Sequence, residues 1–107
     1  MIWDTKSEKD SRIKEKGRWS PLDLDAIDRL VPDRAGVYIF ADVNLHIKYV
    51  GHAGAGNLRE GIKSAIKQRK KGKGATKYKW FATNAKEKAV LLQKDWLQLY
   101  DPPNNLK

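Results

Sequence analysis

The fold of this chain is decided by two short aromatic stretches, Gly36-Val37-Tyr38-Ile39-Phe40 and Ile47-Lys48-Tyr49-Val50-Gly51. β-Branched and aromatic residues dominate both stretches, which is typical of β-strands. The turn-forming run Asp42-Val43-Asn44 separates them, so the two strands are expected to pair antiparallel as a hairpin. We expect that pairing to place the side chains of Tyr38 and Tyr49 at neighbouring positions on one surface.

The rest of the chain predicts helices and one further strand around this hairpin. Apolar spacing favours helices near residues 21–30, 58–66 and 85–100, and a strand over residues 78–82. The last helix is expected to turn four residues inward, namely Ala89, Leu92, Trp96 and Leu99. This order of elements predicts an α+β domain with a small three-stranded, mainly antiparallel sheet flanked by helices.

Two parts are expected along the chain. Residues 1–30 are predicted to be a charged N-terminal extension, with a short helix near residues 21–30 that starts at Ser20-Pro21. Residues 1–18 carry almost no apolar periodicity, so we expect a mobile arm or a frayed helix there. Residues 31–107 are predicted to form the folded domain.

Composition narrows the functional classes. A chain of 107 residues is long enough for one modest core, and it has no cysteine for a disulfide or a thiolate metal site. It contains no apolar run long enough to cross a membrane, and its first residues lack the apolar core of a secretory signal. We therefore expect a cytoplasmic protein without a membrane partner.

The net charge of +9 is concentrated in residues 59–79, which hold nine basic residues and only Glu60 as an acid, a net +8. The basic residues are Arg59, Lys63, Lys67, Arg69, Lys70, Lys71, Lys73, Lys77 and Lys79. Such a segment attracts polyanions by releasing their counterions, which favours contact with nucleic acid. A Lys-rich loop that only maintains solubility is the alternative.

The two tripeptides Gly36-Val37-Tyr38 and Tyr49-Val50-Gly51 resemble the motifs of the GIY-YIG nuclease family. The resemblance extends over about residues 31 to 107, because Asn57-Leu58-Arg59, Tyr100-Asp101-Pro102 and Asn105 follow in the order found in that family. It implies the GIY-YIG fold, with Gly36, Gly51 and Asn105 supporting the site. It also implies phosphodiester cleavage with one divalent metal, Mg²⁺ or Mn²⁺, and DNA as a partner in preference to RNA.

The resemblance also implies roles for individual residues. Tyr38 and Tyr49 take the positions of the family tyrosines that help to activate the attacking water. His52 follows the second tripeptide, where it could move protons, although an exposed loop imidazole is an equally open interpretation. Both tyrosines could also be simple packing residues of a half-buried sheet.

The chain departs from the family at the metal position. Family members hold the metal with a Glu on the last helix, and counting back from Asn105 by the family spacing reaches Gln93. A neutral amide is a poor ligand for a hard divalent cation, which prefers carboxylate oxygen. Gln93 is therefore expected not to bind the metal.

A second departure concerns the family arginine, which neutralises phosphoryl oxygens. Counting without a gap from Tyr49 reaches Arg59, but the buried face of the helix favours Gly61, just before Ile62. We favour Gly61 at the catalytic position and Arg59 as a phosphate contact, and the assignment stays open here.

Together these features predict a nucleic-acid-binding GIY-YIG-like domain with impaired or lost nuclease activity. Its candidate catalytic residues are Tyr38, Tyr49, His52 and Arg59, and Gly61 is a supporting residue. The candidate nucleic-acid contacts are Arg59, Lys63, Lys67, Arg69, Lys70, Lys71, Lys73 and Lys77. The alternatives are an active metal-dependent endonuclease and a non-catalytic module that binds another protein.

Overall fold

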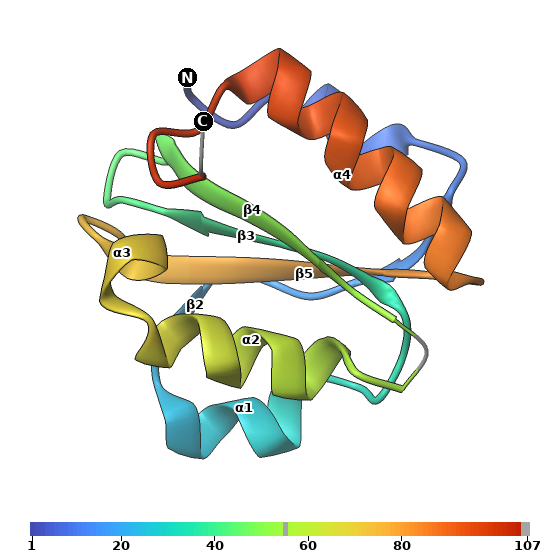
Figure 1. The fold of residues 1–107 in the computed structure, drawn as a ribbon, viewed down its shortest axis with the longest axis horizontal. Helices are drawn as coiled ribbons and strands as arrows, with labels where there is room; N and C mark the ends of the chain where they lie inside the picture. The colour runs from blue at the N-terminus through green and yellow to red at the C-terminus, as the bar shows by residue number, and fades with distance from the viewer. Residues whose placement is uncertain (55, 106–107) are drawn as a thin grey trace.

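The computed structural model describes residues 1–54 and 56–105. They form one antiparallel sheet with helices on both faces (Figure 1). The elements are η1 (Thr5–Lys9), β1 (Ile13–Lys16), β2 (Ser20–Pro21), α1 (Leu24–Leu30), β3 (Gly36–Ala41), β4 (Ile47–Ala53), α2 (Leu58–Lys67), α3 (Arg69–Gly72), β5 (Lys77–Thr83) and α4 (Lys86–Tyr100). Figure 1 shows α4 on one face of the sheet and α1 and α2 on the other. The α+β class predicted from the sequence is confirmed.

The sheet has five strands, whereas three were predicted. Its order is β1-β5-β3-β4, with β2 also paired to β5, so the two additional strands come from the N-terminal residues. The prediction missed them because Ile13-Lys14-Glu15-Lys16 is a mostly charged edge strand without a buried face. Charged residues are common on exposed edge strands because they discourage pairing with other chains.

Residues 1–18 form η1 and β1 instead of the predicted arm or frayed helix. Ser20-Pro21, predicted as a helix start, is strand β2, and α1 begins only at Leu24. The Asp23 side chain caps this helix by accepting a hydrogen bond from the main-chain nitrogen of Asp25 at 3.0 Å. A carboxylate at this position satisfies one of the free amide groups of the first turn, which explains the late start.

Strand β3 lies at the centre of the sheet, and all six of its residues are buried. Because side chains alternate along a strand, Tyr38 and Phe40 face α1 and α2, while Val37 and Ile39 face α4. The α4 side also receives Trp3, whose ring centroid lies 5.0 Å from that of Trp96 and 5.1 Å from that of Tyr100. The N-terminal residues therefore complete the second layer of the core.

The last helix buries one stripe of residues, namely Ala89, Leu92, Trp96 and Tyr100. Leu99, predicted to face inward, is 50% exposed. The four buried positions follow helical spacing, and Leu99 lies about 100° around the helix from Tyr100. Among the described residues, no helix is long and apolar enough to cross a membrane.

Candidate functional site

The predicted hairpin is confirmed, with β3 and β4 paired antiparallel. Phe40 faces Tyr49 and Tyr38 faces Gly51 in the register of the two strands. The rings of Tyr38 and Tyr49 share one face of the sheet, with their centroids 6.1 Å apart. The hairpin therefore brings the two tyrosines together, as the spacing of the tripeptides predicted.

The glycines of the two tripeptides make room for close packing. A Cβ atom at Gly51 would overlap Cζ and Oη of Tyr38, so only glycine leaves space for that ring. A Cβ atom at Gly36 would collide with the main-chain oxygen of Phe81 on the neighbouring strand β5. Both glycines therefore serve the packing of the hairpin, whatever the chemistry of the site.

Tyr38 is 4% exposed and Tyr49 is 9% exposed. Burial raises the pKa of the Tyr38 phenol well above its ordinary value, and the adjacent Tyr49 phenol raises it further. A tyrosine phenol is already protonated at neutral pH, and desolvation disfavours its phenolate form further. Tyr38 can therefore donate a hydrogen bond, but it is not a ready general base.

Helix α2 places Gly61 and Arg59 on different sides of the site. A Cβ atom at Gly61 would lie 3.2 Å from Cβ of Ala53 and 3.6 Å from Cε1 of Tyr38. Arg59 instead points to the loop before β3, where its Nε donates to the main-chain oxygen of Val31 at 2.8 Å. Position 61 thus faces Tyr38, and the guanidinium of position 59 is engaged elsewhere.

Three polar side chains gather around the main chain of Val50, on the open edge of the sheet. The amide of Asn105 accepts from the nitrogen of Val50 at 3.0 Å and donates to its oxygen at 2.8 Å. Gln93 donates to the same oxygen at 3.1 Å, and its Oε1 lies 2.5 Å from Nδ1 of His52. Asn105 and Gln93 therefore occupy backbone groups that no neighbouring strand satisfies.

This donor set does not fit a divalent metal. Gln93 offers a neutral carbonyl oxygen that already bonds the imidazole of His52. Among residues 1–54 and 56–105, no cluster of three His, Asp or Glu side chains is arranged to hold a metal ion. Mg²⁺ and Mn²⁺ prefer carboxylate oxygen, and none is supplied at position 93.

The short helix α3 brings lysines to the same edge of the sheet. A hollow of about 360 Å³ beside Tyr49 is lined by Gln68, Lys70, Lys71, Asn104 and Asn105. The ammonium group of Lys71 lies 5.4 Å from the centroid of the Tyr49 ring, within range of a cation–π contact. Tyr49 and Asn105 therefore border the same hollow as the lysines of α3.

The basic residues of the segment 59–79 fall into two groups. Arg59, Lys63 and Lys79 form ion pairs with Asp33, Asp28 and Glu8, at 3.3, 3.0 and 3.0 Å respectively. In the described part of the chain, no carboxylate lies within 4.0 Å of the ammonium or guanidinium groups of Lys67, Arg69, Lys70, Lys71, Lys73 and Lys77. The cations of the second group are therefore the ones that can pair with an anionic ligand.

The sequence analysis missed two residues of this edge, Lys48 and Asn104. They line a second hollow of about 560 Å³, which adjoins the first and shares Lys70, Asn104 and Asn105 with it. Lys48 sits inside a strand, where a lone lysine carries no signal. Asn104 follows a Pro-Pro pair, which indicates only a turn.

A protein-family model matches most of the chain. It is described as a domain of unknown function, DUF7508, and the match spans residues 13–99. No curated protein matches the chain.

Solved structures similar to this one include GIY-YIG N-terminal endonuclease domains of UvrC from Thermotoga maritima. The domain bound to its catalytic magnesium is 24% identical with a TM-score of 0.65, and the match covers 77% of this chain and 93% of that one. An asparagine-to-alanine mutant of that domain is 22% identical, with a TM-score of 0.65, over 78% of this chain and 93% of that one. A tyrosine-to-phenylalanine mutant is 22% identical, with a TM-score of 0.64, over 78% and 98%.

Likeness at this level of identity shows the fold, and it confirms the fold that the tripeptides predicted. The roles of single residues remain predictions. The chain therefore belongs to the family described as domain of unknown function DUF7508, and its fold is that of the GIY-YIG endonuclease domains.

Proposed function

We propose that this protein is a nucleic-acid-binding domain of the GIY-YIG fold in which metal-dependent cleavage of phosphodiesters is impaired or lost. The residue that carries the proposal is Gln93, because the family spacing counted back from Asn105 implies a metal-binding Glu at this position. Its carbonyl oxygen is neutral and bonds His52, while its amide nitrogen bonds Val50. Both polar atoms of the side chain are therefore engaged within the protein at the position where the resemblance implies a metal ligand.

The position that faces Tyr38 supports the same proposal. It is occupied by Gly61, which supplies no cation to neutralise a phosphoryl oxygen. Arg59 is the nearest arginine along the chain, and it bonds Val31 and Asp33 instead. Fixed cations that stabilise the charge of the transition state account for much of the rate of enzymatic phosphoryl transfer, and position 61 provides none.

Binding is supported by a concentration of cations with no carboxylate within 4.0 Å in the described part of the chain. Arg69, Lys70 and Lys73 are exposed on or next to α3, and Lys70 lines the hollow beside Tyr49. Neutralising several phosphates releases condensed counterions, and this release provides most of the affinity in nonspecific nucleic-acid binding. DNA is the polymer that we expect in preference to RNA, following the resemblance to the nucleases.

The test is incubation of the purified protein with supercoiled plasmid and with single- and double-stranded oligonucleotides of DNA and RNA, in Mg²⁺ or Mn²⁺. Both retention and cleavage are scored. We expect retention that weakens steeply with added salt and no cleavage above the level of the buffer. Metal-dependent cleavage that Tyr49→Phe abolishes would show that the site is active.

The same experiment separates the remaining alternative, a module that binds another protein. That alternative predicts no retention of any nucleic acid at low salt, together with salt-sensitive binding to an acidic protein surface. Retention of an oligonucleotide in preference to an acidic polypeptide of equal charge supports our proposal.

A further inference from the structure

The larger hollow of about 560 Å³ lies where α3, strand β4 and the C-terminal turn after α4 come together. Figure 1 shows α3 and this turn at the same end of the sheet. Its lining includes Lys48 from β4 together with Lys70 and Lys73 from the α3 region. Three lysines from two separate parts of the chain therefore border one concave surface.

The negative charge near these lysines is small. Asp42 is the one carboxylate within 4.0 Å of any of them among the described residues, and it lies 3.8 Å from Nζ of Lys48. Its other oxygen accepts hydrogen bonds from the main-chain nitrogens of Asn44 and His46, both at 2.9 Å, and so Asp42 also holds the hairpin turn. Among residues 1–54 and 56–105, this single, long ion pair leaves the lining of the hollow with an excess of positive charge.

Asn104 fixes this arrangement. Its side-chain amide donates to the main-chain oxygens of Lys71 and Lys73, at 2.9 and 2.8 Å. Its main-chain nitrogen donates to the oxygen of Lys48 at 2.9 Å. One residue thus ties the lysine-bearing loop to the lysine-bearing strand, and Gly74, with a φ of 77°, provides the left-handed turn that leads into β5.

Holding like charges together costs free energy unless an anion neutralises them. The hydrogen bonds of Asn104 already fix the main chain that carries these lysines. An anion that enters the hollow therefore binds without the entropic cost of ordering that loop. A phosphate group presents several oxygens to several ammonium groups at once, and lysine binds phosphate well as a point charge. A carboxylate has fewer oxygens and less charge to satisfy the same three groups.

We propose that this hollow is a phosphate-binding subsite, in which Lys48, Lys70 and Lys73 hold a phosphate of a nucleic-acid strand that continues past Tyr49. The adjoining hollow indicates the direction of the strand, because it shares Lys70, Asn104 and Asn105 with the larger hollow and is also lined by Tyr49. The inference rests on the proposed function and makes it more specific. It places the phosphate contact at α3, in the middle of the segment 59–79 and away from the paired Arg59 and Lys63.

The experiment compares two triple variants of equal charge. The site variant carries Lys48→Gln, Lys70→Gln and Lys73→Gln. The control variant carries Lys9→Gln, Lys14→Gln and Lys88→Gln, which are exposed residues on η1, β1 and α4. Strand β1 lies at the opposite edge of the sheet from β4, so the control removes the same charge from a distant surface.

Binding is measured by fluorescence anisotropy with a labelled oligonucleotide, single-stranded and as a duplex, over a series of salt concentrations. We expect the site variant to lose about tenfold or more in affinity and its salt slope to fall by about one or more, since a phosphate contact is lost. The control variant should lose clearly less affinity and keep the slope. Circular dichroism verifies that both variants are folded.

Equal weakening by the two variants would refute the subsite, because the effect would then come from net charge alone. Poly-glutamate that competes as well as an oligonucleotide of equal charge would refute the preference for phosphate. If the wild-type protein binds nucleic acid and the site variant binds equally well, the subsite is wrong and the proposed function stands. If the wild-type protein binds no nucleic acid at low salt, both fail.

Discussion

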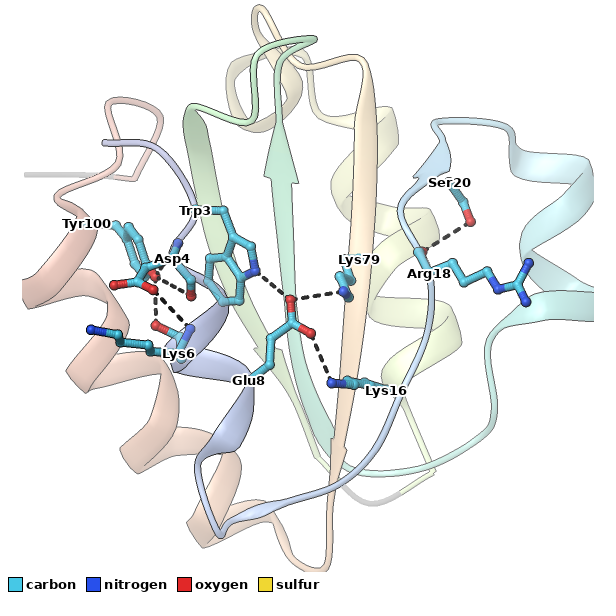
Figure 2. A network of polar contacts seen from close by, with 10 residues as sticks. Trp3, Asp4, Lys6, Glu8, Lys16, Arg18, Ser20, Lys79 and Tyr100 are labelled. Atoms are coloured by element: carbon cyan, nitrogen blue, oxygen red, sulfur yellow. Dashed lines mark hydrogen bonds and ion pairs between the residues drawn. The ribbon is translucent and has the colours of Figure 1, made fainter.

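Replacing Glu8 by Gln tests how the N-terminal residues are held on the sheet. Figure 2 shows the Glu8 carboxylate between Trp3, Lys16 and Lys79. Nε1 of Trp3 donates to it at 2.7 Å, and the two ammonium groups lie 3.0 Å from its oxygens. The side chain of Glu8 is 9% exposed and that of Lys79 is 11% exposed, so this pair is largely shielded from water.

The expected cost follows from these contacts. A Gln side chain keeps the shape and can still accept from Trp3, but it leaves the ammonium of Lys79 without its counter-charge. A hydrogen bond to a charged group contributes about 1.5–3 kcal/mol, and so we expect Glu8→Gln to lower the free energy of unfolding by about 2 kcal/mol. Lys16 is 50% exposed and adds little, because water screens its charge.

The assay is urea denaturation followed by tryptophan fluorescence. A loss of about 2 kcal/mol corresponds to a midpoint lower by about 1 M urea for a protein of this size. The matched control is Glu15→Gln, because Glu15 pairs with Arg34 at 2.9 Å on an exposed surface, with side chains 55% and 37% exposed. We expect the control to cost less than about 1 kcal/mol.

The effect of Glu8→Gln should depend on pH. Burial alone raises the pKa of Glu8, but hydrogen bonds from Trp3, Lys79 and Lys16 outweigh it and hold that pKa below its ordinary value. A lowered pKa in the folded state contributes stability above the pKa of the unfolded chain, and this contribution is lost as the pH falls through the folded value. The gap between wild type and variant should therefore be largest near neutral pH and shrink below about pH 4. A loss no greater than that of Glu15→Gln at neutral pH would refute the reasoning.

Two further predictions concern the site. Gln93→Glu should raise the affinity for Mn²⁺ or Mg²⁺ measured by calorimetry, because it adds a carboxylate beside His52. The control Gln98→Glu, at an exposed position of the same helix, should leave the affinity unchanged. Equal affinities in the two variants would contradict the assignment of position 93. Gly51→Ala should cost about 1–3 kcal/mol in urea denaturation, since its Cβ atom would overlap the Tyr38 ring, whereas Gly72→Ala, which meets no described atom within 4 Å, should be nearly neutral. A harmless Gly51→Ala would show that Tyr38 does not fill that space.

The hairpin and its tyrosines could be predicted because their signals are local. β-Branched and aromatic residues fill both short stretches, a short turn joins the strands, and the spacing sets the register. The same holds for the α+β class and for the last helix, whose apolar stripe was wrong only at its end. There the pattern favoured Leu99, but the hydroxyl of Tyr100 lies 2.6 Å from that of Ser7, so a contact with the distant N-terminal segment places Tyr100 inward.

The sequence by itself determined the paired tripeptides, the amide at position 93 where the resemblance implies an acid, and the location of the excess charge, because each is a property of residue type and local spacing. Only the tertiary structure decided which cations lack a carboxylate partner among the described residues, since Arg59 and Lys63 pair with acids far away along the chain. The tertiary structure also brought Lys48 and Asn104 next to α3 and its lysines. Contacts between distant segments depend on packing of the whole chain, and that packing leaves no periodic trace in the sequence around either partner.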